Sequence, residues 1–241
     1  MKIGGLTIGQ APRVDLAREF QEAAGEGVEL IQAGALDGLS KEAIAAYAPA
    51  RPGGVVLVTR LLDGTEVALD ESLILPLLRA GIRRLEEAGV SSIVLFCTGE
   101  FPPLENSVPL LRPDRLLAHF LKSVAGEEGE SDKADDQLDD VGADRRRIVA
   151  VVPSALQIDE IKRKWARWGM VVEAFALSPY TSSPAQLESA ARAVALMEPK
   201  LIVLDCIGYT RFMKRAFIDA CHVPVVLPRT LLGRAAAELA H

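Results

Sequence analysis

Two cysteines stand in almost the same sequence context at two distant points of the chain. Cys97 follows the apolar run in "IVLFCTG" (residues 93 to 99), and Cys206 follows the one in "IVLDCIG" (residues 202 to 208). If both runs are strands of parallel sheets, both thiols lie at the carboxyl edge, where such sheets bind ligands. A thiolate there is a base, favoured by a helix N-terminus such as the one predicted soon after Cys206. The alternative is that both are small apolar core side chains, and the residues alone leave this open.

A second group of polar residues follows the first predicted strand in "TIGQAPR", residues 7 to 13. Gly9 permits a tight turn, where Thr7, Gln10 and Arg13 offer polar side chains. Arg13 is able to bind a carboxylate with two hydrogen bonds, but the sequence alone slightly favours the alternative, a solvated charge in a first helical turn. Thr59, at the end of the third predicted strand, is a further candidate at the same edge.

The other residues with catalytic chemistry form no constellation. Cys221 lies at the end of a predicted helix and is expected to pack. The histidines, His119, His222 and His241, are scattered, which argues against a zinc site. The sequence has no Gly-x-Ser-x-Gly elbow, Walker loop or Gly-x-Gly-x-x-Gly motif. We therefore expect neither a metal nor a cofactor.

The elements that must position these residues alternate along the chain. Strands are predicted at Lys2–Thr7, Val28–Ala33, Val55–Val58, Ser92–Cys97, Ile148–Val152, Val171–Ala176, Leu201–Cys206 and Val225–Leu227. Helices are predicted at Arg13–Ala24, Ser40–Tyr47, Glu71–Ala88, Asp114–Ala125, Ala155–Trp168, Pro184–Met197 and Thr230–Ala240. Continuous apolar strands alternating with helices indicate a doubly wound, parallel α/β fold. Gly89 and Gly169 fit left-handed ends of two helices, and Asp63-Gly64 is a turn signal.

Composition and charge restrict the class of protein. The 241 residues carry a net charge of -6, and nine acidic residues against one lysine fall within Gly126–Asp144, which predicts an acidic surface loop. No basic stripe is interleaved with aromatic residues, so nucleic acid is not an expected partner. No signal-peptide core and no apolar run of about 18 residues occur, so no membrane association is expected. With three irregularly spaced cysteines, the chain is expected to be cytoplasmic.

Four short stretches together resemble the AroM family: "LTIGQAPR" at the start, "YAP" at residues 47 to 49, "CTG" after the fourth strand and "LDCIGYT" near the end. That family is similar to the aspartate/glutamate racemase superfamily, which includes hydantoin racemases, maleate isomerases and arylmalonate decarboxylases. The resemblance implies two similar α/β domains that face each other across a cleft, with one cysteine from each domain beside it. Four prolines in residues 102 to 113 suggest the boundary, and the resemblance implies that the C-terminal segment returns to the first domain. We expect residues 1–110 with 223–241 in one domain and 111–222 in the other.

The resemblance also implies a reaction. One cysteine thiolate would take a proton from a carbon next to a carboxylate, and the opposite thiol would deliver a proton to the other face. Backbone and hydroxyl groups of Thr98, Gly99, Ile207, Gly208 and the turn at Thr7–Gln10 are placed to stabilise the resulting enediolate. The protein is thus expected to be a cofactor-independent racemase or isomerase with a small-molecule carboxylate as its partner. Whether it forms a homo-oligomer is left open.

The chain departs from the sequences typical of these racemases at both cysteines and at the turn after the first strand. Racemases of the superfamily typically have Cys-Asn-Thr and Cys-Thr-His where this chain has Cys97-Thr98-Gly99 and Cys206-Ile207-Gly208. The assisting histidine is missing, and Gly9-Gln10 replaces an Asp-Ser-Gly turn. Two alternatives therefore remain: a binding or regulatory protein for a carboxylate or aromatic metabolite, and a thiol redox protein, which no Cys-x-x-Cys motif supports.

Overall fold

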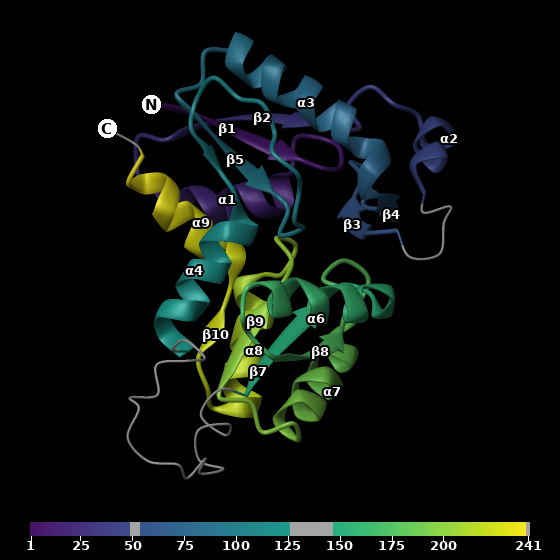
Figure 1. Cartoon of the computed structure of the whole chain (residues 1–241), viewed down its shortest axis with the longest axis vertical. Helices are drawn as coiled ribbons and strands as arrows, with labels where there is room; N and C mark the ends of the chain where they lie inside the picture. Colours follow the sequence, from purple (N-terminus) through teal and green to yellow (C-terminus); the bar gives the residue numbers. More distant parts are fainter. Residues whose placement is uncertain (49–53, 126–146, 240–241) are drawn as a thin grey trace. The chain divides into compact units, whose positions relative to one another are not determined.

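The computed structural model describes residues 1–48, 54–125 and 147–239, and in these the chain is an α/β protein with two parallel sheets (Figure 1). Each sheet lies in its own compact unit. Unit 1 comprises Met1–Asp114 and Pro228–His241, and unit 2 comprises Arg115–Leu227. The predicted class, two similar domains with parallel sheets, is confirmed. The acidic stretch Gly126–Asp144 lies outside the described residues.

The sheet of unit 1 has the strand order β2-β1-β5-β6, and every neighbouring pair is parallel. Its strands are β1 (Lys2–Thr7), β2 (Glu29–Gly34), β5 (Ser92–Phe96) and β6 (Leu110–Leu111). The short strand β6 was not predicted. It lies within the proline-rich segment and pairs only with Ile93 and Val94 of β5.

Helices cover both faces of this sheet. They are α1 (Val14–Ala24), α3 (Glu71–Glu87) and α9 (Pro228–Ala237). Ile74 and Leu78 of α3 share one core cluster with Leu6 of β1. On the opposite side, α1 packs along α9, and Phe20 of α1 meets Phe96 of β5 edge to face at 5.1 Å between ring centroids. Coverage on both faces explains why these strands read as continuous apolar runs.

The third predicted strand does not join this sheet. It forms β3 (Val56–Arg60), which pairs antiparallel with β4 (Glu66–Asp70) in a separate two-stranded sheet. The cause is the short connection: the Asp63-Gly64 turn, in which Gly64 has a φ of 91°, reverses the chain at once, whereas parallel strands need a long crossover. Next to this hairpin in sequence lie α2 (Lys41–Ile44) and the 3-10 helix Ala45–Tyr47.

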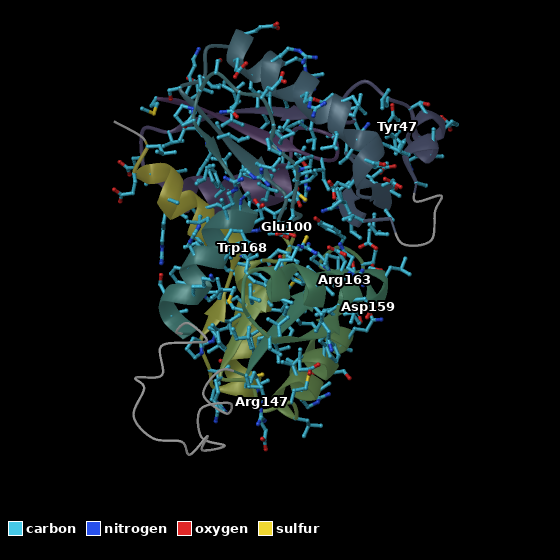
Figure 2. All side chains as sticks on the ribbon, in the orientation of Figure 1. Tyr47, Glu100, Arg147, Asp159, Arg163 and Trp168 are labelled. Carbon is cyan, nitrogen blue, oxygen red and sulfur yellow. The ribbon has the colours of Figure 1, made fainter. Side chains whose placement is uncertain are left out.

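Unit 2 repeats the parallel arrangement with the strand order β10-β9-β7-β8. Its strands are β7 (Ile148–Val152), β8 (Val172–Ala176), β9 (Leu201–Leu204) and β10 (Val225–Val226). Its helices are α4 (Pro113–Ala125), a 3-10 turn (Ala155–Gln157), α6 (Ile158–Arg167), α7 (Pro184–Ala195) and α8 (Arg211–Cys221). Helices α7 and α8 share one core cluster. Trp168, labelled in Figure 2, lies at the end of α6 and meets His119 of α4 edge to face, with 5.4 Å between the ring centroids.

The return of the chain to unit 1 begins with α9. The sequence-based division placed residues 223–241 in the first domain, but Val225 and Val226 of β10 pair with β9, so this strand belongs to the sheet of unit 2. Helix α9 then packs along α1, which is why the last helix is counted with unit 1.

Local sequence signals account for the ends of several helices. The Asp70 side chain caps α3 by accepting a hydrogen bond from the Ser72 N–H at 2.9 Å, and Ser183 forms a capping box with Gln186 at the start of α7. Gly89 and Gly169 have φ values of 73°, the left-handed conformation predicted for them. No helix in the described ranges is long and apolar enough to cross a membrane.

Candidate active site

Cys97 directly follows β5 and is 8 % exposed. Its Sγ accepts a hydrogen bond from the Gly99 N–H at 3.4 Å. A Cβ at Gly99 would lie 2.7 Å from Cδ2 of Leu57, so any larger residue here would have to displace that side chain of β3. Thr98 between them is also buried. The turn thus holds the thiol with a backbone donor aimed at its sulfur.

The turn after β1 lies against the same strand. Thr7 Oγ1 accepts a hydrogen bond from the Gly9 N–H at 3.3 Å, and a Cβ at Gly9 would lie 2.5 Å from Thr59 Oγ1 and 2.8 Å from the Arg60 carbonyl. Because Leu57 and Thr59 are two residues apart, they occupy one face of β3. The structure therefore brings two predicted site residues of unit 1, Gly9 and Gly99, against β3, the strand that carries Thr59, and Thr7 is hydrogen-bonded to the first of them.

Thr59 has an unusual property within this group. Its side chain is only 1 % exposed, and its Oγ1 has no hydrogen-bond partner within the described part of the chain. A buried hydroxyl without a partner costs about 1–3 kcal/mol, so native proteins rarely keep one without a reason. A bound ligand is one such reason.

Gln10 holds the loops of unit 1 together. Its Nε2 donates to the carbonyls of Leu39 at 3.1 Å and Leu36 at 3.5 Å, and its Oε1 accepts from the Leu62 N–H at 3.1 Å. The side chain thereby ties the first turn to the segment after β2 and to the β3–β4 turn. Gln10 has a clear structural task, and binding of substrate by this residue stays a prediction.

Arg13 does bind a carboxylate with two hydrogen bonds, but the carboxylate is that of Asp15. Its Nε and Nη2 donate to the two oxygens of Asp15 at 2.8 and 2.7 Å, and its side chain is 3 % exposed. Arg13 is therefore not the solvated charge that was the alternative. Burial raises the pKa of Asp15, but the hydrogen bond and charge of Arg13 outweigh it and leave this pKa below its ordinary value.

Cys206 stands in a similar turn in unit 2, beyond the end of β9. It is 7 % exposed, and its Sγ accepts a hydrogen bond from the Gly208 N–H at 3.3 Å. Ile207 between them is buried. Helix α8 begins shortly afterwards and is capped by Thr210, whose Oγ1 accepts from the Met213 N–H at 3.2 Å. The predicted proximity of this thiol to a helix start is thus present in the fold.

Tyr180 is a neighbour of Cys206 that the sequence interpretation did not include. Its Oη lies 3.8 Å from Cys206 Sγ, and a Cβ at Gly208 would lie 2.5 Å from the same Oη. The tyrosine follows β8 in "LSPY", residues 177 to 180. The sequence therefore contains a signal for Tyr180 as a site residue, because a tyrosine just after a parallel strand lies at the same edge of the sheet as Cys206.

Asp205 points away from this turn, as strand alternation predicts. Its two carboxylate oxygens each accept a hydrogen bond from Lys164 Nζ at 2.9 Å, and Oδ2 also accepts from Trp165 Nε1 at 2.9 Å. All three residues are buried. Cys206, by contrast, belongs to the cluster formed with α7 and α8. This buried ion pair has no signature in the sequence, because Lys164 has the position of an ordinary charge on an amphipathic helix.

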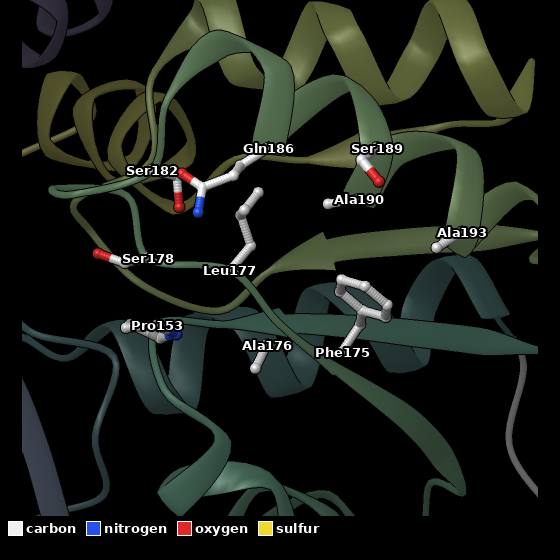
Figure 3. Close-up of a pocket in the computed structure, with 10 residues that line it drawn as sticks. All are labelled: Pro153, Phe175, Ala176, Leu177, Ser178, Ser182, Gln186, Ser189, Ala190 and Ala193. Carbon is white, nitrogen blue, oxygen red and sulfur yellow. The ribbon is translucent and has the colours of Figure 1, made fainter.

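A hollow of about 350 Å³ opens in unit 2 near the carboxyl ends of β7 and β8 (Figure 3). Serine and glutamine side chains lie beside apolar ones in its wall, which is formed by Pro153, Phe175, Ala176, Leu177, Ser178, Ser182, Gln186, Ser189, Ala190 and Ala193. None of these lining residues is charged. The hollow therefore suits a neutral polar group better than a carboxylate.

Cys221 is the remaining thiol. It is half-buried at the end of α8, and its Sγ lies 3.6 Å from the Ala191 carbonyl, to which it donates. Burial raises its pKa, which favours the thiol over the thiolate. This agrees with the packing role predicted for it.

Solved structures with similar folds are enzymes of one group. Unliganded arylmalonate decarboxylase matches with a TM-score of 0.60 at 15 % identity, covering 100 % of this chain and 92 % of the decarboxylase. The aspartate racemase of Picrophilus torridus matches with a TM-score of 0.52 at 12 % identity, covering 99 % and 94 %. The maleate isomerase Iso of Pseudomonas putida S16 matches with a TM-score of 0.57 at 11 % identity, covering 98 % and 90 %. These likenesses define the fold class as that of the Asp/Glu racemases.

Sequence comparison identifies the family. The profile of the AroM protein family matches residues 3–130 and 136–240, nearly the whole chain. The chain therefore belongs to the AroM family, as the four short stretches predict. A search of curated proteins found no sequence match.

Proposed function

We propose that the protein is a cofactor-independent racemase or isomerase of a small carboxylate, in which Cys97 and Cys206 exchange protons with the two faces of one substrate carbon. The observation that supports this most directly is the shared geometry of the two thiols. In each unit, the cysteine follows a central parallel strand, and its Sγ accepts a hydrogen bond from the glycine N–H two residues later, at 3.4 and 3.3 Å. Racemases, an isomerase and a decarboxylase among the similar folds support the same class of reaction.

The proposed reaction conserves protons over one turnover. A thiolate takes the proton from the carbon next to the carboxylate, and the C–H electron pair moves into the carboxylate to form an enediolate. The thiol on the other face then gives its proton to that carbon. The two cysteines have exchanged protonation states, so the reverse reaction restores them. Cysteine suits both roles, because its ordinary pKa of about 8.5 lies close to neutrality.

The hydroxyl of Thr59 is the group that we assign to the substrate carboxylate. It is buried and without a partner in the described residues, and it lies beside the Gly9 turn, on the strand β3 whose Leu57 packs against Gly99 next to Cys97. Such a preformed donor stabilises negative charge as it develops on the carboxylate oxygens. Gln10 and Arg13 are assigned a supporting role, since they hold the turn.

A second candidate is a small-molecule binding or regulatory protein with the same fold. The observation that favours it is Gly208, which stands where the racemases of the superfamily carry an assisting histidine. A chain that had lost proton transfer would keep the cysteines as part of a binding surface. Solvent exchange separates the two functions.

The test is deuterium uptake by a panel of small 2-substituted carboxylic acids in D₂O, without added cofactor or metal. We expect the wild type to racemise or isomerise at least one acid with incorporation of deuterium. Cys97→Ser and Cys206→Ser should each abolish interconversion, because a serine hydroxyl is a far weaker acid and adds several kcal/mol to the barrier, about 1.4 kcal/mol for each tenfold loss of rate. Each variant should still exchange the proton of the one enantiomer that faces its remaining thiol.

Cys221→Ser is the matched control, and it should keep the wild-type rate. Two results would count against the proposal. If both single variants interconvert a substrate at the wild-type rate, the cysteines are structural. If acids bind without any deuterium uptake, the binding function replaces the enzymatic one.

A further inference from the structure

The strongest unassigned feature of the molecule is the contact between Tyr180 and Cys206. Tyr180 lies in the segment between β8 and α7, which several hydrogen bonds fix in place. Ser178 Oγ accepts from the N–H groups of Tyr180 and Thr181, both at 3.1 Å, and Ser183 caps α7. The backbone that carries Tyr180 is therefore held on both sides of the residue.

The ring reaches the sulfur only because residue 208 is a glycine. A Cβ at Gly208 would lie 2.5 Å from both Cζ and Oη of Tyr180, closer than such atoms approach in proteins. With the glycine, Oη lies 3.8 Å from Cys206 Sγ, and the Gly208 N–H also donates to that sulfur. Gly208 thus serves the thiol twice: its N–H is a donor, and its missing side chain leaves room for the tyrosine.

We propose that Tyr180 is a catalytic residue of this site, whose hydroxyl donates a hydrogen bond to the Cys206 thiolate and accepts one from the Cys206 thiol. The role rests on the proposed function, and it supplies the polar contact that the missing histidine would otherwise make. Tyrosine ordinarily ionises near pH 10, above the thiol, so the phenol keeps its proton when Cys206 is a thiolate. After Cys206 has taken a proton from the substrate, the S–H group donates to Oη, and the hydrogen bond reverses without net proton transfer.

The surroundings of Cys206 support this role. Residues Leu177, Tyr209 and Met213 belong to the same apolar cluster as the sulfur, and an apolar environment strengthens a hydrogen bond to a charged atom. The charged residue next to it in the chain, Asp205, points to the other face and is paired with Lys164. Arg211 begins α8, whose N-terminus adds positive potential.

The test uses a protein in which Cys206 is the sole thiol, made by Cys97→Ser and Cys221→Ser, since the chain has three cysteines. Thiolate formation is followed by ultraviolet absorbance against pH, with a variant lacking all three cysteines as the reference. Tyr180→Phe should raise the midpoint of Cys206 ionisation by about one pH unit, as expected for loss of one long hydrogen bond to a charged group. The rate of alkylation by iodoacetamide near neutral pH should fall in parallel.

Two further variants separate the hydroxyl from its packing. Tyr209→Phe is the matched control: its Oη donates to the Leu177 carbonyl at 2.6 Å, so this variant loosens the same segment without removing a donor from the sulfur. We expect its midpoint to stay unchanged. Gly208→Ala should displace the Tyr180 ring and raise the midpoint, with little further change when combined with Tyr180→Phe.

The assignment is overturned if Tyr180→Phe leaves the midpoint unchanged, or if Tyr209→Phe shifts it equally, since packing would then explain the shift. None of these measurements needs a substrate. An unchanged midpoint would leave the two-cysteine reaction intact, and failure of the deuterium assay would leave the Tyr180 contact intact, so the two proposals fail independently.

Discussion

The ion pair between Lys164 and Asp205 makes the folding of unit 2 sensitive to a single substitution. Lys164 is 2 % exposed and Asp205 is 3 % exposed, and the lysine donates to both carboxylate oxygens at 2.9 Å. Lys164→Met keeps a long unbranched side chain of similar size on α6 but removes the counter-charge. The carboxylate is then left buried, with the donor of Trp165 remaining beside it.

The expected loss is large for a protein of this size. Removing one partner of a buried ion pair costs about 3–5 kcal/mol, because the remaining charge keeps its desolvation cost and loses its compensation. A domain typically has about 5–15 kcal/mol of unfolding free energy, so the variant should lose at least about a fifth of the stability of unit 2. The pair itself need not be strongly stabilising, because a well-packed apolar pair often replaces it without loss.

The double variant Lys164→Met/Asp205→Leu therefore distinguishes charge from packing. It removes both charges and leaves the Trp165 N–H without its Asp205 acceptor, which costs about 1–3 kcal/mol. We expect it to be more stable than Lys164→Met alone. Two single substitutions acting independently would instead give a double variant less stable than either.

Urea unfolding followed by tryptophan fluorescence is the assay, since both tryptophans, Trp165 and Trp168, lie in unit 2 and report on this unit. Lys162→Met is the matched control on the same helix: its partner Glu173 is exposed, and the loss should stay below about 1 kcal/mol. The reasoning is refuted if Lys164→Met loses no more than this control, or if the double variant is the least stable of the set.

Two further predictions concern unit 1. Hydrogen bonds from Lys41 and from the Thr65 N–H lower the pKa of Asp63 to about 2. The stability that the ionised carboxylate contributes is therefore present above the pKa of the unfolded state, near 3.8, and is lost as the pH falls towards 2. Lys41→Met should raise that pKa in an NMR titration of the side-chain carboxyl, and an unchanged value would contradict this. Arg229 is fully buried and donates to the Asp15 carbonyl at 3.2 Å. Arg229→Met should therefore destabilise α9 by about 2 kcal/mol and speed the hydrogen exchange of its amides. Unaltered exchange rates in α9 would disprove this.

The parallel sheets were predictable from the sequence because burial on both faces leaves a strong signal. Each of the eight predicted strands appears within two residues of its expected ends, and Gly89 and Gly169 have the predicted left-handed conformation. The hairpin of β3 and β4 was missed, since Glu66–Asp70 has too few apolar residues to stand out as a strand. Strand β6 is too short for any periodic signal.

Residues of the candidate site were predictable only where a reactive or polar residue directly follows a predicted strand. Cys97, Cys206 and the Gly9 turn all follow apolar runs, so their position at the sheet edge could be inferred. The partners of Arg13 and Lys164 could not be, because a charged residue on an amphipathic helix looks the same in sequence whether its partner is water or a buried carboxylate. Only the fold shows that both charges are buried and compensated.

The two cysteine turns share their backbone geometry but differ in the side chain that covers them. Leu57 lies against Gly99, whereas Tyr180 lies against Gly208 and brings a hydroxyl to Cys206. The unpartnered hydroxyl of unit 1, Thr59, lies beside the Gly9 turn instead. Under the proposed function, Tyr180 would stabilise the charge on the Cys206 thiolate, and Thr59 would offer its hydroxyl to the charge on the substrate. The repeated Cys-x-Gly sequence therefore encodes a common way of holding a thiol, while a different side chain packs on each glycine.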